Sequence, residues 1–179
     1  MEPTDAALVE RCLAGSKEAY ARLVRRHQDA VYNLALRWTR DRDAADDLAQ
    51  EVFIRAYRKL GTYNSRYSFR NWLLTICSNQ AKNSIRSAER RQRAHEAHTE
   101  LFPTGGGPED PRAARLEEAL GRLPAESRAA LVLKHVEGLS YEELAQVMAI
   151  GVSAAKMRVK RARDEVVRWF RNQREEGEC

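Results

Sequence analysis

The chain has 179 residues, of which 43 % are hydrophobic and 32 % are charged. This length allows one or two domains with a modest core in each. The three cysteines, Cys12, Cys77 and Cys179, are scattered and odd in number, so they do not indicate a disulfide framework, and a reducing cytoplasm is the simpler interpretation. No apolar run approaches 18 residues and the N-terminus has no signal-peptide core, so we expect a cytoplasmic protein with no membrane insertion.

Basic charge is concentrated in particular segments. Residues 1–95 hold 18 Lys and Arg against 11 Asp and Glu, and residues 153–171 hold seven against two. A net charge of +5 spread evenly would say little about function, but basic surfaces of this kind are typical of nucleic-acid binding.

The N-terminal half reads as four helices with no lasting strand pattern. Helices are predicted from Asp5 to Gly15, from Ser16 through Trp38, over 43–60, and from Phe69 to about residue 91. His27 falls on the apolar stripe of the second helix, where we expect a core side chain and not a catalyst.

Residues 94–111 have few large apolar side chains and contain the run PTGGGP, so they cannot offset the entropy of ordering. The predicted fold class is therefore all-α, with two small helical domains joined by a flexible linker. The predicted boundaries are 1–94 for the first domain, 95–111 for the linker and 112–179 for the second domain. In the second domain, Pro124 is expected at the N1 position of a helix.

The second domain ends in a predicted helix-turn-helix. Ser140 and Glu143 form a capping box, Gly151 and Val152 make the turn, and Ser153 is expected to cap a longer helix. The outer face of that helix carries Ser153, Lys156, Met157, Lys160 and Arg161, opposite an apolar stripe. A helix of this kind fits the DNA major groove; an ordinary αα-hairpin with a solvated basic face is the alternative.

The sequence lacks a convincing catalytic arrangement. The acidic cluster at 46, 47 and 51 has no histidine or phosphate-binding loop nearby, and the glycines at 105–107 lack a preceding strand and a following Lys-Ser/Thr. His95, His98 and Cys179 do not have zinc-site spacing. We therefore expect no enzyme activity, no metal and no cofactor.

The loop 62–68 and the polar half of the fourth helix suit melted DNA. Aromatic rings can stack on bases, arginines can hold the backbone, and amides can read base edges. The candidate residues are Tyr63, Arg66, Tyr67, Asn79, Lys82, Asn83 and Arg86. The alternative for the two tyrosines is that they cover the core.

With these features in place, the chain resembles a bacterial RNA polymerase sigma factor of the extracytoplasmic-function group of the sigma-70 family, in its two-domain form. Residues 46–57 (DDLAQEVFIRAY) resemble region 2.2, and 69–73 (FRNWL) with 79–83 (NQAKN) resemble regions 2.3 and 2.4. Residues 138–145 (GLSYEELA) and the helix after them resemble region 4. The turn departs from many members, with Ala149 where glycine is common and Gly151 where proline is common.

The resemblance implies a function in transcription initiation, in response to stress and under the control of an anti-sigma factor. Its implied partners are core RNA polymerase, through the β′ clamp and the β flap, and promoter DNA. The clamp would be contacted by Asp46, Asp47, Gln50, Glu51, Ile54 and Arg55. The loop and the fourth helix would capture a base flipped from the −10 element, and the 153–161 face would read the −35 element as duplex. A DNA-binding regulator that never joins polymerase and an RNA-binding regulator are the rival interpretations.

Overall fold

The structure is a computed structural model that describes residues 2–94 and 110–177. These residues form eight α-helices and one short 3-10 helix, with no strand among them. The elements are α1 (Asp5–Leu13), α2 (Lys17–Thr39), α3 (Arg42–Arg58), η1 (Leu60–Thr62), α4 (Phe69–Ala94), α5 (Pro111–Gly121), α6 (Ala125–His135), α7 (Tyr141–Met148) and α8 (Val152–Gly177). The all-α prediction is confirmed for the described residues.

Helices α1 to α4 form the N-terminal domain, and short polar side chains set where three of them begin. Thr4, Ser16 and Asp41 each accept a hydrogen bond from a backbone N–H three residues ahead, which satisfies a donor left free by the first helical turn. α2 packs against α1, α3 and α4 and is the centre of this domain. Its buried stripe includes Leu23 and Leu34.

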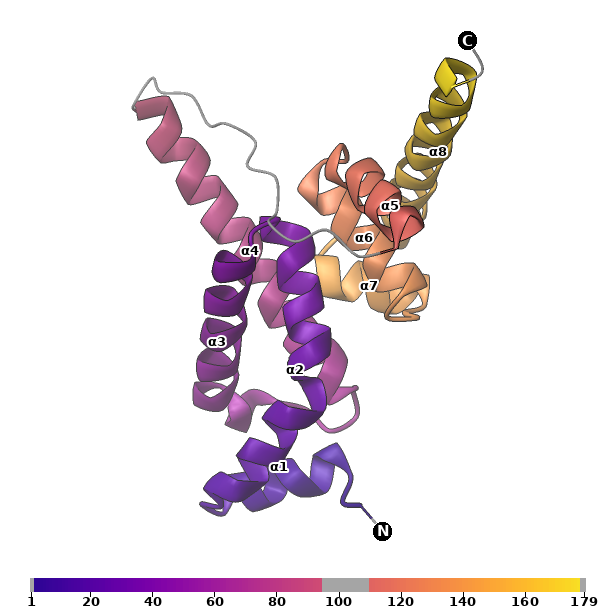
Figure 1. The fold of residues 1–179 in the computed structure, drawn as a ribbon. Coiled ribbons are helices and arrows are strands. Elements are labelled where there is room, and N and C mark those ends of the chain that lie inside the picture. The colour runs from indigo at the N-terminus through magenta and orange to yellow at the C-terminus, as the bar shows by residue number, and fades with distance from the viewer. Residues whose placement is uncertain (1, 95–109, 178–179) are drawn as a thin grey trace.

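α4 changes character along its length. Its first turns bury Leu73, Leu74 and Cys77 in the core of the N-terminal domain. Its later turns form a polar half that exposes Asn79, Asn83 and Arg86. This half extends away from the rest of the domain (Figure 1). One helix therefore contributes both to the core and to a long polar surface.

Helices α5 to α8 form the C-terminal domain, and two predicted helix starts are wrong. Pro124 is the N-cap of α6 and not its N1 residue, because its ψ of 143° is extended and the helix begins at Ala125. Ser153 does not cap α8; the helix already begins at Val152, and Ala155 N–H bonds the carbonyl of Gly151. The capping box of α7 is confirmed, with Ser140 and Glu143 bonding each other's backbone N–H groups.

The two domains pack directly against each other. α6 lies against α2, and α7 lies against α4 (Figure 1). Asp110 and Pro111, at the end of the predicted linker, are the N-cap and first residue of α5. The rest of that linker, 95–109, lies outside the described residues, as do His95, His98 and Cys179. No helix in the described part of the chain combines the length and apolar character needed to cross a bilayer.

Candidate functional site

The predicted polymerase-binding residues lie together on the outer face of α3. This α3 stripe consists of Asp46, Asp47, Gln50, Glu51, Ile54 and Arg55, and all six are exposed. The opposite face is held in the core by Leu48, Val52 and Ala56. Because the stripe projects from a helix that is anchored along its length, it is a rigid surface.

The α3 stripe has an apolar component among its charges. Ile54 is 53 % exposed, and Tyr57, one turn further on, is 48 % exposed. Large apolar side chains on a charged helix face are typical of a docking surface. Tyr57 was not among the predicted site residues; its signal in the sequence is its three-residue spacing from Ile54.

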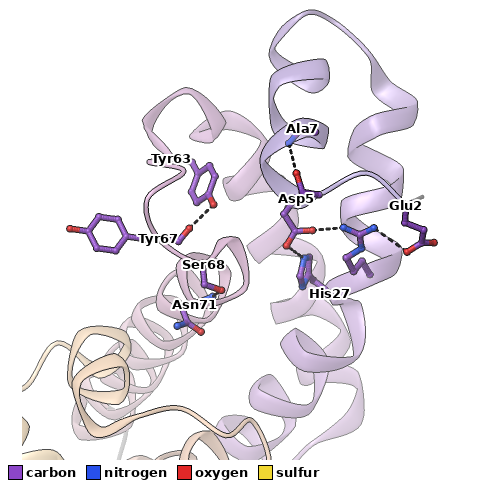
Figure 2. Close-up of polar contacts among 10 residues, drawn as sticks. Glu2, Asp5, Ala7, His27, Tyr63, Tyr67, Ser68 and Asn71 are labelled. Atoms are coloured by element: carbon purple, nitrogen blue, oxygen red, sulfur yellow. Dashed lines mark hydrogen bonds and ion pairs between the residues drawn. The ribbon is translucent and has the colours of Figure 1, made fainter.

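The loop after η1 is ordered by its own hydrogen bonds. The Tyr63 hydroxyl donates to the carbonyl of Tyr67 at 2.6 Å, and the Asn64 side chain accepts from the Arg66 backbone N–H at 3.0 Å (Figure 2 shows the tyrosine pair). Tyr67 is 62 % exposed, and Figure 2 shows its ring pointing away from the rest of the loop. The loop therefore presents one free aromatic ring and one arginine.

The two tyrosines have different surroundings. The Tyr63 ring contacts Phe69 at 5.2 Å and Trp72 at 5.5 Å between centroids, so it covers the core. Burial raises the pKa of its hydroxyl. Tyr63 therefore fits the alternative interpretation, in which the tyrosines cover the core. Tyr67 instead has the exposure that base stacking requires.

Trp72 connects the loop to the polar face of α4. It precedes Asn79 by seven residues, which is two helical turns and about 10 Å along the axis. Asn79, Asn83 and Arg86 are exposed on this same side of the helix. We call the surface made by Tyr67, Arg66, Asn79, Asn83 and Arg86 the loop–α4 face. Trp72 was not among the predicted site residues, and its signal in the sequence is its position seven residues before Asn79.

Unlike Asn79 and Asn83 on the same helix, Lys82 is not free to contact DNA. It is half-buried, and its Nζ donates to the carbonyl of Met148, the last residue of α7. Burial lowers the pKa of this amine. Of the predicted −10 residues, Lys82 is thus the one whose polar group is occupied by the C-terminal domain.

The N-terminal helix braces this region from behind. Asp5 on α1 accepts from Arg26 at 2.7 Å and lies 2.8 Å from Nε2 of His27 (Figure 2). His27 is buried, as expected for a core side chain, and its ring contacts Phe69 at 5.5 Å between centroids. Burial lowers the pKa of His27. This network ties α1 to the aromatic cluster that carries the loop.

The predicted −35 residues share the exposed face of α8. Ser153, Lys156, Met157, Lys160 and Arg161 are all exposed, and Met157 is exposed by 46 %. We call these five residues the α8 face. Ala155, Val159 and Ala162 on the other side are buried against α6 and α7. The Nζ of Lys156 lies 5.7 Å from the centre of the Tyr141 ring, which helps to orient it along the first turn of α8.

Comparisons with known proteins match both domains. The sigma-70 region 2 model matches residues 23–91, and the sigma-70 region 4 model matches residues 113–166. The RNA polymerase sigma-H factor of Pseudomonas aeruginosa is 35 % identical over 90 % of this chain and 91 % of its own length. The ECF RNA polymerase sigma-E factor of Escherichia coli K12 is 34 % identical over 91 % of this chain and 92 % of its own length.

The chain belongs to the ECF group of the sigma-70 family. The fold agrees with this. The sigma factor RpoE of Bartonella quintana, solved in complex with the anti-sigma factor NepR, has a TM-score of 0.72 and 24 % identity, over 85 % of this chain and 96 % of that one. Members of this family are transcription initiation factors, not a family of enzymes.

All three surfaces of this sigma factor lie within the residues that match the sigma-70 region 2 and region 4 models. The α3 stripe and the loop–α4 face lie within the region 2 match, and the α8 face lies within the region 4 match. α1 precedes the region 2 match, so the Asp5 bracing of the loop involves residues on both sides of its boundary.

Two cysteines of this sigma factor are buried. Burial raises the pKa of the Cys77 thiol to about 12, and it also raises that of Cys12. A thiol reacts through its thiolate, so burial disfavours the reactive form of both side chains in this fold.

Proposed function

We propose that this sigma factor binds the clamp of core RNA polymerase through the α3 stripe and recognises promoters through the other two surfaces. The loop–α4 face captures a base of the melted −10 element, with Tyr67 as the stacking ring and Asn79 and Asn83 as readers of base edges. The α8 face enters the major groove of the −35 element. The observation that carries this proposal is that one chain exposes a mixed polar–apolar helix face, an aromatic–amide surface and a basic recognition helix.

The chemistry of each surface suits its target. Flipping a base costs a few kcal/mol, which stacking at about 1–3 kcal/mol per base and hydrogen bonds can offset. Lysine and arginine on α8 are suited to phosphates and to guanine edges in duplex DNA. The α3 stripe offers carboxylates around Ile54, the combination of apolar anchor and polar rim found at protein interfaces.

The same proposal covers the other expected partners. The C-terminal domain contacts the β flap, and an anti-sigma factor controls the chain in response to stress, a type of partner seen with the Bartonella quintana structure. The chain acts in the cytoplasm with no catalysis, metal or cofactor of its own. Its domains are 1–94 and 112–179, with 95–111 as the connection.

Transcription with purified core polymerase on a promoter library tests the proposal. The chain should associate with core enzyme and produce promoter-specific transcripts that neither component makes alone. A self-sufficient DNA-binding regulator would bind duplex DNA without associating with core enzyme. Absence of both association and transcripts would overturn the proposal.

A further inference from the structure

A hollow of about 360 Å³ lies where α2, α4, α6 and α8 meet. Three cationic side chains line it, namely Lys82 and Arg86 from α4 and Arg158 from α8. Among the described residues of its wall, Glu126 on α6 is the one carboxylate, and it pairs with Arg158. The wall therefore holds three positive charges against one negative charge, and the volume lies within the range of small-ligand sites.

The excess of positive charge affects the ionisation of Lys82. Burial is the largest cause that lowers the pKa of this amine. Glu126 opposes the shift, whereas Arg158 and Arg86 lower the pKa further. Cations that are held close together repel one another, so a bound anion lowers the energy of this group of charges.

The first turn of α6 adds backbone donors to the same wall. Residues 124–127 line the hollow, and no side chain caps the start of this helix. The first N–H groups of a helix have no partner within it and carry partial positive charge. Helix N-termini bind phosphate and carboxylate groups for this reason.

Trp38 at the end of α2 supplies a further donor. It lines the hollow and is 3 % exposed, and its Nε1–H has no hydrogen-bond partner among the described residues. A buried donor without a partner is unfavourable. An oxyanion bound against this wall provides the acceptor that the indole lacks.

We propose that this hollow binds a small phosphate-bearing anion. Its oxygens accept hydrogen bonds from Arg158, from Arg86 and from the first N–H groups of α6, and the charge of Lys82 attracts it from the side. Phosphate suits the site better than a carboxylate, because it has more acceptor oxygens for donors that come from several directions. Arg86 also belongs to the loop–α4 face, but this binding does not depend on the proposed function.

Titration of the full chain with pyrophosphate tests the site. Calorimetry measures the affinity, and proton–nitrogen correlation spectra report on the three tryptophans of the chain, Trp38, Trp72 and Trp169. Trp72→Phe and Trp169→Phe assign the indole signals. Pyrophosphate should shift the Trp38 signal and leave the other two in place. Sodium chloride and sodium acetate at the same ionic strength should not produce this shift.

Two variants that break the same ion pair should have opposite effects on the affinity. Arg158→Gln removes a cation from the wall and should weaken pyrophosphate binding by about tenfold or more. Glu126→Gln removes the competing carboxylate and should strengthen binding by about threefold. Damage to the packing alone does not produce opposite signs, because the ion pair is lost in both variants.

Arg163→Gln is the matched control. It makes the same charge change as Arg158→Gln at an exposed position of α8 that does not line the hollow, so it should retain the wild-type affinity. The dispersion of the indole signals shows whether each variant is folded.

The remaining outcomes would each contradict the proposal. Absence of both heat and signal shifts at millimolar pyrophosphate would remove the site, and a shift that sodium chloride reproduces would reduce it to general screening. An equal response to acetate would overturn the assignment to phosphate. Weakening by Glu126→Gln, or by Arg163→Gln as much as by Arg158→Gln, would place the anion elsewhere. None of these measurements involves polymerase or DNA, so their result is independent of the transcription assay.

Discussion

Ala149 adopts a left-handed conformation at the turn between α7 and α8, with φ of 54°. This conformation brings Cβ close to the following carbonyl oxygen and costs an L-residue roughly 1–2 kcal/mol. Glycine does not have this clash, which is a physical reason for the glycine that the family resemblance leads one to expect here. The position also joins the two helices of the helix-turn-helix, so its strain lies within the DNA-reading unit.

Ala149→Gly should therefore stabilise the chain by about 0.5–1 kcal/mol, since relief of the clash exceeds the extra backbone entropy that glycine loses on folding. Chemical denaturation measures the change in the free energy of unfolding. Gly138 has φ of 71°, so Gly138→Ala is the matched reverse substitution and should destabilise by a similar amount. A loss of stability in Ala149→Gly would show that the turn is not strained.

Lys160 is the single-residue test of the α8 face. It is exposed in the middle of this basic surface, opposite buried Val159 and Ala162. Lys160→Ala should weaken −35 binding by about 1–3 kcal/mol if the amine contacts a base, or lower the salt slope by about 0.9 if it neutralises a phosphate. Titration of holoenzyme on promoter DNA at several salt concentrations distinguishes the two. No change in either quantity would remove Lys160 from the interface.

At the scale of the helices, most of the architecture could be predicted from local chemistry. The caps at Ser16 and Ser140 follow from side chains that bond nearby N–H groups, and the apolar stripes of α2 and α8 follow from their spacing. The errors at Pro124 and Ser153 are of one or two residues. They arise because a cap depends on the ψ of one residue, which the residue type alone does not determine.

The α3 stripe gives a prediction at this scale, because it acts as one helix face. Glu51→Arg should weaken binding to core polymerase by about tenfold or more, since a reversed charge meets the complementary surface of the partner. Glu51 is exposed and accepts a hydrogen bond from Gln80, so stability should change by less than about 0.5 kcal/mol. A competition assay with labelled wild-type chain measures the affinity.

Asp29→Arg is the control for this charge reversal. Asp29 is exposed on α2 and is not part of the α3 stripe, so this variant should bind core polymerase like the wild type. Equal affinity of Glu51→Arg and Asp29→Arg would remove the α3 stripe from the clamp interface.

At the scale of the whole molecule, the packing of the two domains could not be predicted. The pairs Arg70–Glu137 and Asn71–Glu143 join residues about 70 positions apart on either side of a polar segment. Each side chain alone is typical of a solvated surface, and periodicity contains no information about which surface it meets. For the same reason, the occupied state of Lys82 within the predicted −10 set could be recognised only from the structure.

Arg128 connects the two domains, so its removal tests whether they unfold together. Its guanidinium bonds the carbonyls of Leu120 and Leu123 within the C-terminal domain and that of Arg37 in α2. Burial, together with nearby Arg40 and Arg37, lowers its pKa to about 10. The residue thus joins the two domains at the cost of desolvating a charge.

The wild type should unfold in one calorimetric transition, because Arg128 links the stabilities of both domains. Arg128→Met keeps much of the volume but removes the guanidinium donor from the carbonyls of Arg37 and Leu123, at about 1–3 kcal/mol for an unsatisfied buried group. We expect two separated transitions, with the C-terminal domain melting first. Arg122→Met removes a cation whose side chain is 62 % exposed and should retain one transition. If Arg128→Met also melted in a single transition at the wild-type temperature, the domains would be coupled by contacts other than this arginine.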